Sequence, residues 1–219
     1  MNAPVIAIDG PSASGKGAVA SRVAETLGFH YLESGALYRL VALLSLREAT
    51  LEEGTLARLA QEMNLVFRGG LILLDNHDVA DNIRSEDVGN RASEVARMPK
   101  VREMLLKRQR AFRQPPGLVA DGRDMATVVF PDATLKIFLT ATPEIRAERR
   151  YKQLIEKGIN ANLRALSRDL QERDARDRNR PIAPLVPAPD SQVLDSSGLS
   201  IEAVVERILE SYQAVGGRK

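Results

Sequence analysis

The N-terminal part of the chain alternates short apolar runs with helical periodicity. Residues 5–8 are apolar and precede a cluster of glycine, proline and serine, which is typical of a buried strand. Apolar residues then recur at helical spacing over residues 17–27, and Gly28 ends the pattern. A second short strand is expected at 29–32, and a long apolar helix follows through Arg47. This order predicts the opening of a parallel sheet.

The middle of the chain has a different pattern. Short apolar runs in "LVFRGGLILLDNHDV" are interrupted at Gly69-Gly70 and Asp75-Asn76, which predicts a small meander or hairpin inserted into the core. Helical periodicity returns over residues 88–112, is interrupted at Met98-Pro99, and stops at the Pro-Pro-Gly of 115–117.

The last part returns to strands and helices. The runs "LVADGRD" (118–124) and "LKIFLTA" (135–141) end in polar residues, as strands do at the ligand edge of a doubly wound sheet. We expect further elements at 143–157 (helix), 162–178 (helix), 181–189 (extended), 192–197 (strand) and 201–212 (helix with a Gly-Gly end). The pattern predicts one α/β domain with a parallel sheet flanked by helices.

Composition narrows the class of protein. With 219 residues, 44% of them hydrophobic, the chain is large enough for a packed core, and the absence of cysteine excludes disulfides, thiolate metal sites and cysteine nucleophiles. No export signal or apolar run of about 20 residues is seen. We therefore expect a cytoplasmic protein that does not interact with membranes.

The charge is local rather than global. The formal net charge is +2, but arginines are concentrated in residues 97–113 and 168–180. A nucleic-acid surface usually combines a basic face with stacking aromatics, whereas aromatics here are 4% and tryptophan is absent. The pattern favours a small anionic ligand over a nucleic acid.

A phosphate-binding loop is the strongest local motif. Residues 10–16 satisfy G-x-x-x-x-G-K between a predicted strand and a predicted helix, so Lys16 is expected to reach the β- and γ-phosphates of a nucleotide. An ordinary glycine-rich turn is the alternative. The predicted nucleotide-binding residues are Gly10, Pro11, Ser12, Ala13, Ser14, Gly15, Lys16, Gly17 and Ala18.

The loop departs from the general motif at one position. Gly17 stands where serine or threonine usually helps to hold Mg²⁺, so we expect the metal to be held by phosphate oxygens and water, without a direct protein ligand. Asp9 and Asp121 are candidate outer-shell acceptors, although either could instead cap a helix or pair with an arginine. No Asn-Lys-x-Asp motif for guanine is present, which favours an ATP-dependent phosphotransferase.

Five segments in order carry a family resemblance. They are "DGPSASGKG" (9–17), "SGALYR" (34–39), "ADGRDMATVVFPDA" (120–133), "RDRNRPIAPLVPA" (176–188) and "LDSS" (194–197). The chain resembles the bacterial cytidylate kinases over almost its whole length. The resemblance implies an ATP- and Mg²⁺-dependent kinase that converts CMP, and dCMP, to the diphosphates in pyrimidine nucleotide metabolism.

The family resemblance also implies a division of the chain. A nucleoside monophosphate kinase has a parallel-sheet core, an insert that binds the monophosphate and a mobile lid. We expect the core at 1–54, 98–147 and 183–219, the insert at about 55–97 and the lid at about 148–182. No exposed apolar stripe in the sequence indicates a dimer, so we expect a monomer.

The resemblance assigns residues to the transferring and acceptor phosphates. Arg39, Arg123 and Arg173 are expected to grip the phosphate of the acceptor, with a hydrogen bond from Ser34. Lys16, Arg123 and Arg173 are the expected catalytic residues, because transfer between two polyanions requires cations that neutralise charge and fix the geometry.

Other matching positions are expected to read the nucleoside. Ser93, Arg102 and Asp124 match residues that bind the cytosine edge, and Asp177 and Arg180 match residues near the ribose. Cytosine has an amino donor where uracil has an acceptor, so the Asp124 carboxylate is expected to discriminate between them.

Each of these residues also has a simpler interpretation. Arg173 and Asp177 lie four positions apart on a predicted helix and could form a surface ion pair. Arg102 could be one charge on a solvated face, and Ser34 could be a helix N-cap.

Arg146, Arg149 and Arg150 are weaker candidates for contacts with ATP, and a solvated helix face is an equally good interpretation of them. His30 and His77 have no partners at metal-ligand spacing, and we assign them no function.

Three departures from the family pattern are expected to have small effects. Ala18 and Ala126 stand where the family commonly has threonine and glycine, and Ala13-Ser14 replaces a Gly-Ala pair in the loop. We expect slightly altered ATP affinity. Alternative functions are a kinase for UMP or AMP, and a non-catalytic phosphate-loop protein that senses ATP or binds RNA.

Overall fold

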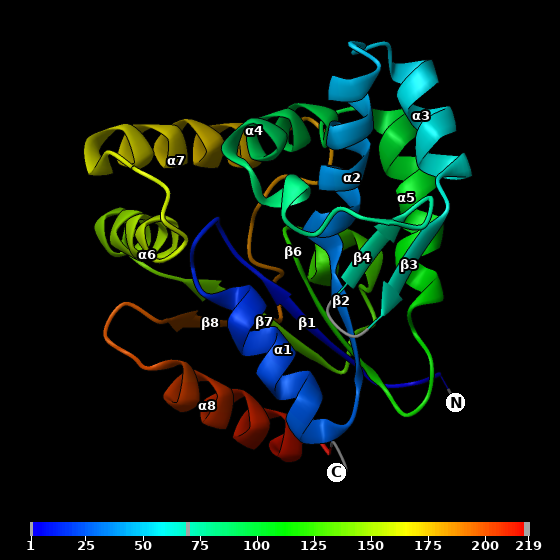
Figure 1. Cartoon of the computed structure of the whole chain (residues 1–219). Helices are drawn as coiled ribbons and strands as arrows, with labels where there is room; N and C mark the ends of the chain where they lie inside the picture. Colours follow the sequence, from blue (N-terminus) through cyan, green and yellow to red (C-terminus); the bar gives the residue numbers. More distant parts are fainter. Residues whose placement is uncertain (1, 69–70, 217–219) are drawn as a thin grey trace. The chain divides into compact units, whose positions relative to one another are not determined.

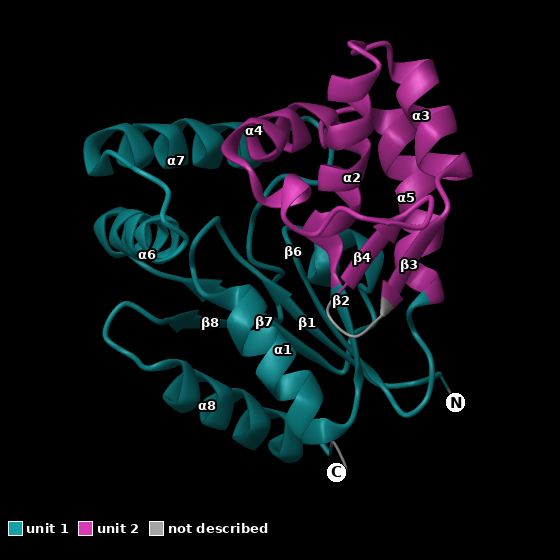
Figure 2. Cartoon of the chain, viewed as in Figure 1, with its two compact units in different colours: residues 1–32, 112–219 teal, residues 33–111 magenta. Residues whose placement is uncertain are grey.

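The computed structural model describes residues 2–68 and 71–216. The chain divides into two compact units (Figure 2): residues 1–32 with 112–219, and residues 33–111. Two sequence-based expectations, the turn at Gly69-Gly70 and the second glycine at the end of the closing helix, Gly217, lie outside the described residues. Figure 1 gives the order of the elements.

The first unit is built on a five-stranded sheet with the order β2-β6-β1-β7-β8. Strands β6, β1, β7 and β8 pair in parallel, with Asp9 at the end of β1 opposite Gly122 of β6 and Phe138 of β7. The strand bounds are β1 Val5–Asp9, β2 His30–Glu33, β6 Leu118–Gly122, β7 Leu135–Thr140 and β8 Gln192–Asp195. The predicted α/β class and its strands are confirmed.

The main hydrophobic core of this unit lies between the sheet and two helices. Side chains of β1, β6 and β7 pack with those of α1 (Lys16–Leu27) and α8 (Ile201–Ala214). Phe29 meets Tyr212 of α8 edge to face, with ring centroids 5.9 Å apart. Burial of these apolar side chains fixes the ends of β1 and β7, from which the candidate site is built.

Two further helices of this unit were predicted, and one element was not. Helices α6 (Pro143–Glu156) and α7 (Leu163–Arg178) confirm the expected helices at 143–157 and 162–178. Residues 181–189 form neither helix nor strand. The segment Met125–Val129, for which the sequence pattern predicted no element, forms a π-helix, η2, between β6 and β7.

The second unit contains helices and a small antiparallel sheet. Its helices are α2 Ser34–Arg47, α3 Glu53–Glu62, α4 Glu86–Val95, α5 Pro99–Ala111 and the short 3₁₀ helix η1 Asn82–Arg84. Strands β3 (Leu65–Arg68), β4 (Leu71–Leu74) and β5 (His77–Asp78) follow one another in the sheet, so the predicted meander is confirmed. Asp75 and Asn76 turn between β4 and β5 with φ of 50° and 66°.

The second unit begins and ends outside the insert expected at 55–97, since it spans residues 33–111. The division into core, insert and lid stays a prediction. None of the helices in residues 2–68 and 71–216 combines the length and the apolar character that a membrane span requires.

Candidate active site

The phosphate loop, residues 10–16, connects β1 to α1 and is shaped by its backbone. A Cβ atom at Gly10 would lie 2.0 Å from the carbonyl oxygen of Leu139 on β7, so only glycine fits at this position. Ala13 and Gly15 have φ of 59° and 90°, in the left-handed region. The loop therefore turns sharply into the N-terminus of α1, where unpaired N–H groups and the helix dipole favour an anion.

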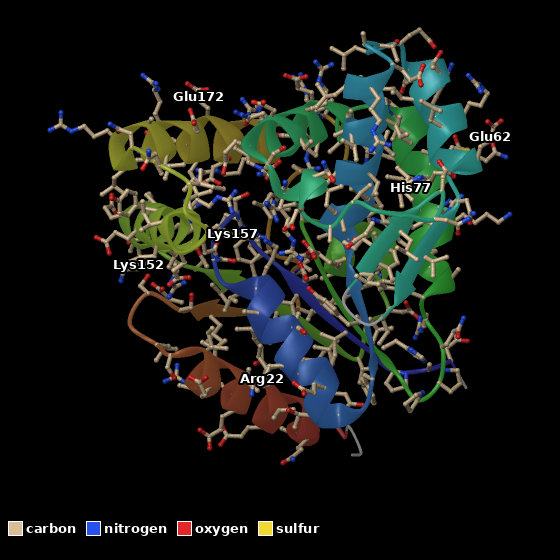
Figure 3. The ribbon with its side chains drawn as sticks, in the orientation of Figure 1. Arg22, Glu62, His77, Lys152, Lys157 and Glu172 are labelled. Atoms are coloured by element: carbon tan, nitrogen blue, oxygen red, sulfur yellow. The ribbon has the colours of Figure 1, made fainter. Side chains whose placement is uncertain are left out.

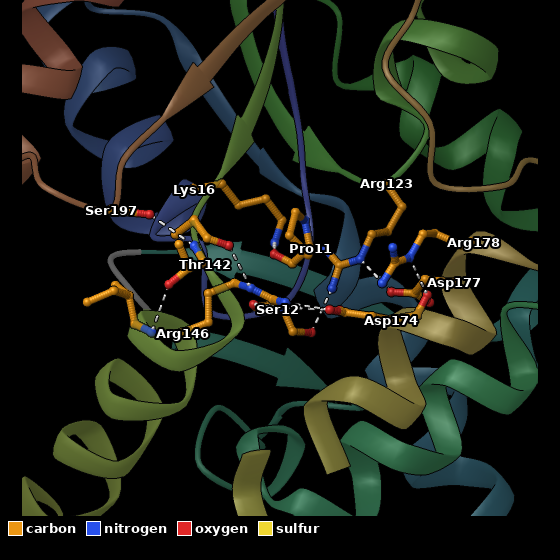
Figure 4. Close-up of polar contacts among 12 residues, drawn as sticks. Pro11, Ser12, Lys16, Arg123, Thr142, Arg146, Asp174, Asp177, Arg178 and Ser197 are labelled. Carbon is orange, nitrogen blue, oxygen red and sulfur yellow. Dashed lines mark hydrogen bonds and ion pairs between the residues drawn. The ribbon is translucent and has the colours of Figure 1, made fainter. Parts of the chain in front are cut away.

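Lys16 lies in a buried and strongly charged environment. Its Nζ donates a hydrogen bond to the carbonyl oxygen of Pro11 at 3.1 Å (Figure 4). Burial lowers the pKa of Lys16 to about 7, with further lowering by Arg123 and Arg173 and an opposing effect of Asp121. A bound polyanion would favour the charged ammonium, so this lysine suits a phosphate ligand.

Ser14 provides a second indication that the loop fits an anionic group. Its Oγ is buried and, within the described part of the chain, has no hydrogen-bond partner. A buried hydroxyl normally forms a hydrogen bond, and a phosphate oxygen would supply the acceptor. The donors of this loop therefore fit the phosphates of a nucleotide.

Arg123 joins the phosphate loop to α7. Its Nη2 donates to Oγ of Ser12 at 2.8 Å and its Nε donates to Oδ2 of Asp177 at 2.7 Å (Figure 4). Burial alone would raise the pKa of Asp177, but Arg123 and Arg173 hold it below its ordinary value. Nε of Arg180 donates to the carbonyl oxygen of Asp177 at 3.3 Å. The structure thus brings together most of the predicted residues of this unit.

The surface-ion-pair interpretation of Arg173 and Asp177 is wrong. Asp177 is only 3% exposed and forms an ion pair with Arg123, which comes from outside its own helix. The exposed side of α7 carries Glu172 instead (Figure 3). Since Asp177 is desolvated, its charge interacts more strongly with the nearby arginines than a surface charge would.

A second buried ion pair, between Arg146 of α6 and Asp174 of α7, was not predicted. Nη1 of Arg146 donates to Oδ1 of Asp174 at 3.1 Å, Nη2 donates to Oδ2, and both side chains are 4% exposed. Nη1 also donates to the carbonyl oxygen of Ser12 at 3.2 Å. The solvated-face interpretation of Arg146 is therefore wrong, because this guanidinium ties the phosphate loop to two helices.

Arg149 supports the other side of the loop. Its Nη1 donates to the carbonyl oxygen of Ser14 at 3.1 Å, and its Nη2 donates to that of Ser196, after β8, at 2.6 Å. The solvated-face interpretation is wrong here too. Nη1 of Arg150 donates to Oε1 of Gln153 on the same helix at 3.4 Å, and Lys152 is exposed on α6 (Figure 3).

Asp9 caps the π-helix η2, one of the alternatives open from the sequence. Its two carboxylate oxygens accept from the backbone N–H groups of Met125 and Ala126, both at 2.8 Å. Burial raises the pKa of Asp9 to about 7 in spite of these bonds, and Asp124 raises it further. Asp9 therefore holds the segment that begins directly after Asp124.

Asp121 accepts a hydrogen bond from Oη of Tyr31 at 2.6 Å. Within residues 2–68 and 71–216, no group of three or more histidine, aspartate or glutamate side chains is arranged to hold a metal ion. Asp121 also raises the pKa of Lys16, so its carboxylate lies within electrostatic reach of the loop, and a carboxylate is of the chemical type that accepts hydrogen bonds from the water ligands of Mg²⁺.

In the second unit, the predicted residues Ser34 and Arg39 are held by hydrogen bonds within that unit. Ser34 is the first residue of α2 and its buried Oγ accepts from Nε2 of Gln109 at 3.1 Å. The N-cap is Glu33, so the N-cap interpretation of Ser34 is wrong. Arg39 donates through Nη1 to the carbonyl oxygen of Ile83 at 2.7 Å.

The other two predicted residues of the second unit are also buried. Arg102 of α5 is 7% exposed, lies 5.8 Å from the ring centroid of Tyr38 and donates to the carbonyl oxygen of Ala96 at 3.3 Å. The solvated-face interpretation of Arg102 is wrong, since cation–π contact and burial fix the guanidinium. Ser93 is buried within α4.

Both histidines contact backbone oxygens near the surface. Nε2 of His30 lies 3.0 Å from the carbonyl oxygen of Pro115, and Nδ1 of His77 lies 2.8 Å from that of Asp75. His77 begins the short strand β5 rather than lying in the turn where the sequence placed it, and Figure 3 shows its position.

In the first unit, the first strand of a parallel sheet ends in a lysine-bearing loop, and guanidinium groups gather around that loop. This arrangement defines the class of phosphate-loop phosphotransferases. Residues 6–214 match the family model described as cytidylate kinase. The chain belongs to the cytidylate kinase family, which confirms the resemblance seen in the sequence.

Relatives and solved structures agree with this assignment. The chain is 60% identical over 214 residues to a cytidylate kinase of Bordetella bronchiseptica, covering 97% of this chain and 96% of the relative. It is 57% identical over 215 residues to one of Burkholderia ambifaria, covering 97% and 94%. A crystal structure of a gluconokinase from Sinorhizobium meliloti, 15% identical, gives a TM-score of 0.52 with 97% and 93% covered, and shows the fold alone.

Proposed function

We propose that the protein transfers the γ-phosphoryl group of ATP to CMP, and to dCMP, giving ADP and CDP or dCDP. The observation that carries this proposal, in a chain of the cytidylate kinase family, is the position of Arg123. Its guanidinium donates both to Ser12 of the phosphate loop and to buried Asp177. A cation fixed beside the donor loop is what the approach of a second phosphate requires.

The chemistry is electrostatic and geometric. Lys16 and the loop N–H groups hold the β- and γ-phosphates of ATP, and Arg123 with Arg173 neutralises charge on the transferring group and on the acceptor. When bound with ATP, Mg²⁺ neutralises the phosphate oxygens, and Asp121 would accept from its water ligands. No covalent intermediate is needed, because direct in-line transfer forms one P–O bond as another breaks.

The acceptor assignments rest on the family resemblance. Arg39 and Ser34 are assigned to the acceptor phosphate, in addition to Arg123 and Arg173. The remaining assignments are Ser93, Arg102 and Asp124 for cytosine and Asp177 and Arg180 for the ribose. The burial of Asp124, which is 2% exposed, supports its role in reading the base. A desolvated carboxylate binds the amino donor of cytosine favourably and repels the carbonyl oxygen of uracil.

We further propose that residues 148–182 close over the reacting phosphates as a lid and exclude water that would otherwise hydrolyse ATP.

The protein is proposed to act in the cytoplasm as a monomer. Light scattering on the purified protein tests the monomer, and a mass of about twice 24.0 kDa would contradict it.

The first test mixes the purified protein with MgATP and one acceptor at a time, CMP, dCMP, UMP, GMP or AMP, and quantifies the diphosphates by chromatography. CDP and dCDP should form much faster than UDP, GDP or a second ADP. Faster formation of UDP from UMP, or of a second ADP from AMP, would establish a different nucleoside monophosphate kinase. Binding of ATP without any diphosphate product would support a non-catalytic ATP sensor instead.

A variant at the proposed base contact tests specificity. Asp124→Ala should lower kcat/KM for CMP by about 10- to 100-fold, the value of one good base-edge contact, and should narrow the preference over UMP. Glu206→Ala removes an exposed carboxylate on α8 and serves as the matched control. Equal losses with CMP and UMP would show that Asp124 does not read the base.

A further inference from the structure

The position after the loop lysine has no side chain of its own but has two polar neighbours. A Cβ atom at Gly17 would lie 3.6 Å from Oη of Tyr31 and 3.9 Å from Oδ2 of Asp121, both ordinary contact distances. Phosphate loops in general carry serine or threonine here, and its hydroxyl helps to hold Mg²⁺. The tyrosine hydroxyl and the carboxylate therefore border the volume that this missing hydroxyl would occupy.

Tyr31 and Asp121 form a fixed pair. Oη of Tyr31 donates to Oδ2 of Asp121 at 2.6 Å, the length of a charge-assisted O–H···O⁻ bond, and lies 3.5 Å from the carbonyl oxygen of Gly17. The two side chains come from β2 and β6, which are neighbours in the five-stranded sheet. A sheet fixes such a pair more rigidly than a loop does.

The pair also lies within electrostatic reach of the phosphate-binding lysine. Asp121 raises the pKa of Lys16, against the larger effect of burial, so its carboxylate is close to the group that contacts the β- and γ-phosphates. A phenol that donates its proton to a carboxylate keeps lone pairs that accept hydrogen bonds. Water bound to a divalent cation is a strong donor to such acceptors.

We propose that Tyr31 is a positioning residue for the Mg²⁺ of MgATP, and that its hydroxyl replaces the one missing at Gly17. Tyr31 fixes Asp121, and the two oxygens accept hydrogen bonds from the water shell of the cation. This inference rests on the proposed function, because it requires that ATP binds at the loop with Mg²⁺. It explains how this chain does without the usual hydroxyl.

The test measures nucleotide binding rather than turnover. The affinity for the ATP analogue AMP-PNP is determined by calorimetry with Mg²⁺ and with EDTA, for the wild type and for Tyr31→Phe. We expect Tyr31→Phe to reduce the gain in affinity from Mg²⁺ by about 5- to 10-fold, which is within the range of one ordinary hydrogen bond. The affinity in EDTA should change less than twofold.

Rescue separates this role from a structural one. Gly17→Ser has room for its Cβ, and in the Tyr31→Phe background it should restore most of the Mg²⁺-dependent affinity. Tyr212→Phe removes a buried hydroxyl in the core and is the matched control. Equal losses with Mg²⁺ and EDTA, or no rescue by Gly17→Ser, would show that the Tyr31 bond only ties two strands together.

The two proposals fail in different ways. If the wild type binds no AMP-PNP, the proposed function itself is contradicted. If the wild type binds AMP-PNP equally well with and without Mg²⁺, the inference about Tyr31 is overturned, while the proposed function is not affected. If the wild type gains affinity from Mg²⁺ and Tyr31→Phe gains the same amount, only the inference about Tyr31 is overturned. An electron paramagnetic resonance spectrum of Mn²⁺ in the nucleotide complex that is identical in both proteins would likewise overturn the inference about Tyr31.

Discussion

Replacement of Asp9 by asparagine should change how the stability of the protein depends on pH. Burial raises the pKa of Asp9 from 3.8 to about 7, so the folded protein holds a proton on this carboxyl that the unfolded chain releases. The stabilisation is complete below about pH 4 and is lost as the pH rises through about 7. The difference between the two pKa values corresponds to about 4 kcal/mol.

The measurement is urea unfolding of the wild type and of Asp9→Asn between about pH 5 and pH 8. The free energy of unfolding of the wild type, minus that of the variant, should fall by about 2 to 3 kcal/mol between about pH 5 and 7, and then level off. Asparagine accepts from only one of the two N–H groups of η2, which adds an offset that does not depend on pH. Asp177, whose pKa is lowered, titrates below this range and cancels in the difference.

A flat difference over this range would refute the reasoning. It would mean that the two hydrogen bonds from Met125 and Ala126, which favour the carboxylate, outweigh the cost of burying its charge. Asp87→Asn removes an exposed carboxylate from α4 and controls for the loss of a negative charge. A slope of the same size in that control would also contradict the assignment to Asp9.

Three further predictions concern the phosphate loop and its supports. Burial and then Arg123 lower the pKa of Lys16 to about 7, so binding of nucleotide near pH 8 should be accompanied by net proton uptake, measured by calorimetry in buffers of different ionisation enthalpy. Lys16→Arg should take up no proton, and no uptake by the wild type would contradict this prediction. Arg146→Met should lower the free energy of unfolding, measured in urea, by about 3–5 kcal/mol, because it leaves the Asp174 carboxylate buried without its partner. Adding Asp174→Leu should recover most of this loss, and additive losses from the two substitutions would refute the pairing. Ala13→Gly should raise the free energy of unfolding by about 0.5 to 1 kcal/mol, because the φ of 59° at this position strains a residue that has a Cβ atom. A lower free energy of unfolding would show that the added freedom of the unfolded chain outweighs this strain.

The strands were predictable because burial leaves a local mark on the sequence. Strand β1 is buried along its whole length and reads as one apolar run, while β7 alternates buried and half-buried residues. Helix α3 was missed because only Leu56 and Ala60 of it are buried, which is too narrow a stripe to stand out. Its N-cap, Glu52, is also outside the usual set of capping residues.

The π-helix η2 had no local signal at all. Its first N–H groups, of Met125 and Ala126, are satisfied by Asp9, which lies 116 and 117 residues earlier in the chain. A helix start usually shows a capping side chain just before it, but Asp124 makes no such bond. Since the cap comes from a distant strand, periodicity and capping rules could not find this element.

The candidate site divides in the same way. The phosphate loop is contiguous, so its motif was visible in the sequence. The arginines of α6 looked like a solvated face because a sequence shows charge but not desolvation. Arg146 is buried by Asp174, 28 residues away, and Arg123 is fixed by Ser12, 111 residues away. One local signal of this arrangement was present in the sequence, because Asp174 and Asp177 are three residues apart and share a helix face.

These contacts indicate how the protein keeps several cations beside an anion-binding loop. Arg123 and Arg146 both donate to Ser12, and each is also paired with a carboxylate of α7, Asp177 and Asp174 respectively. The carboxylates offset the repulsion between the guanidinium groups and keep each one in a single orientation. Arg146 supports the loop through these contacts. Arg123 is anchored by Asp177 and also donates to the hydroxyl of Ser12, a bond that we propose a phosphate oxygen takes over when substrate binds. The cations are thus held in position before any polyanion binds, so little of the binding energy of the nucleotides is spent on orienting them.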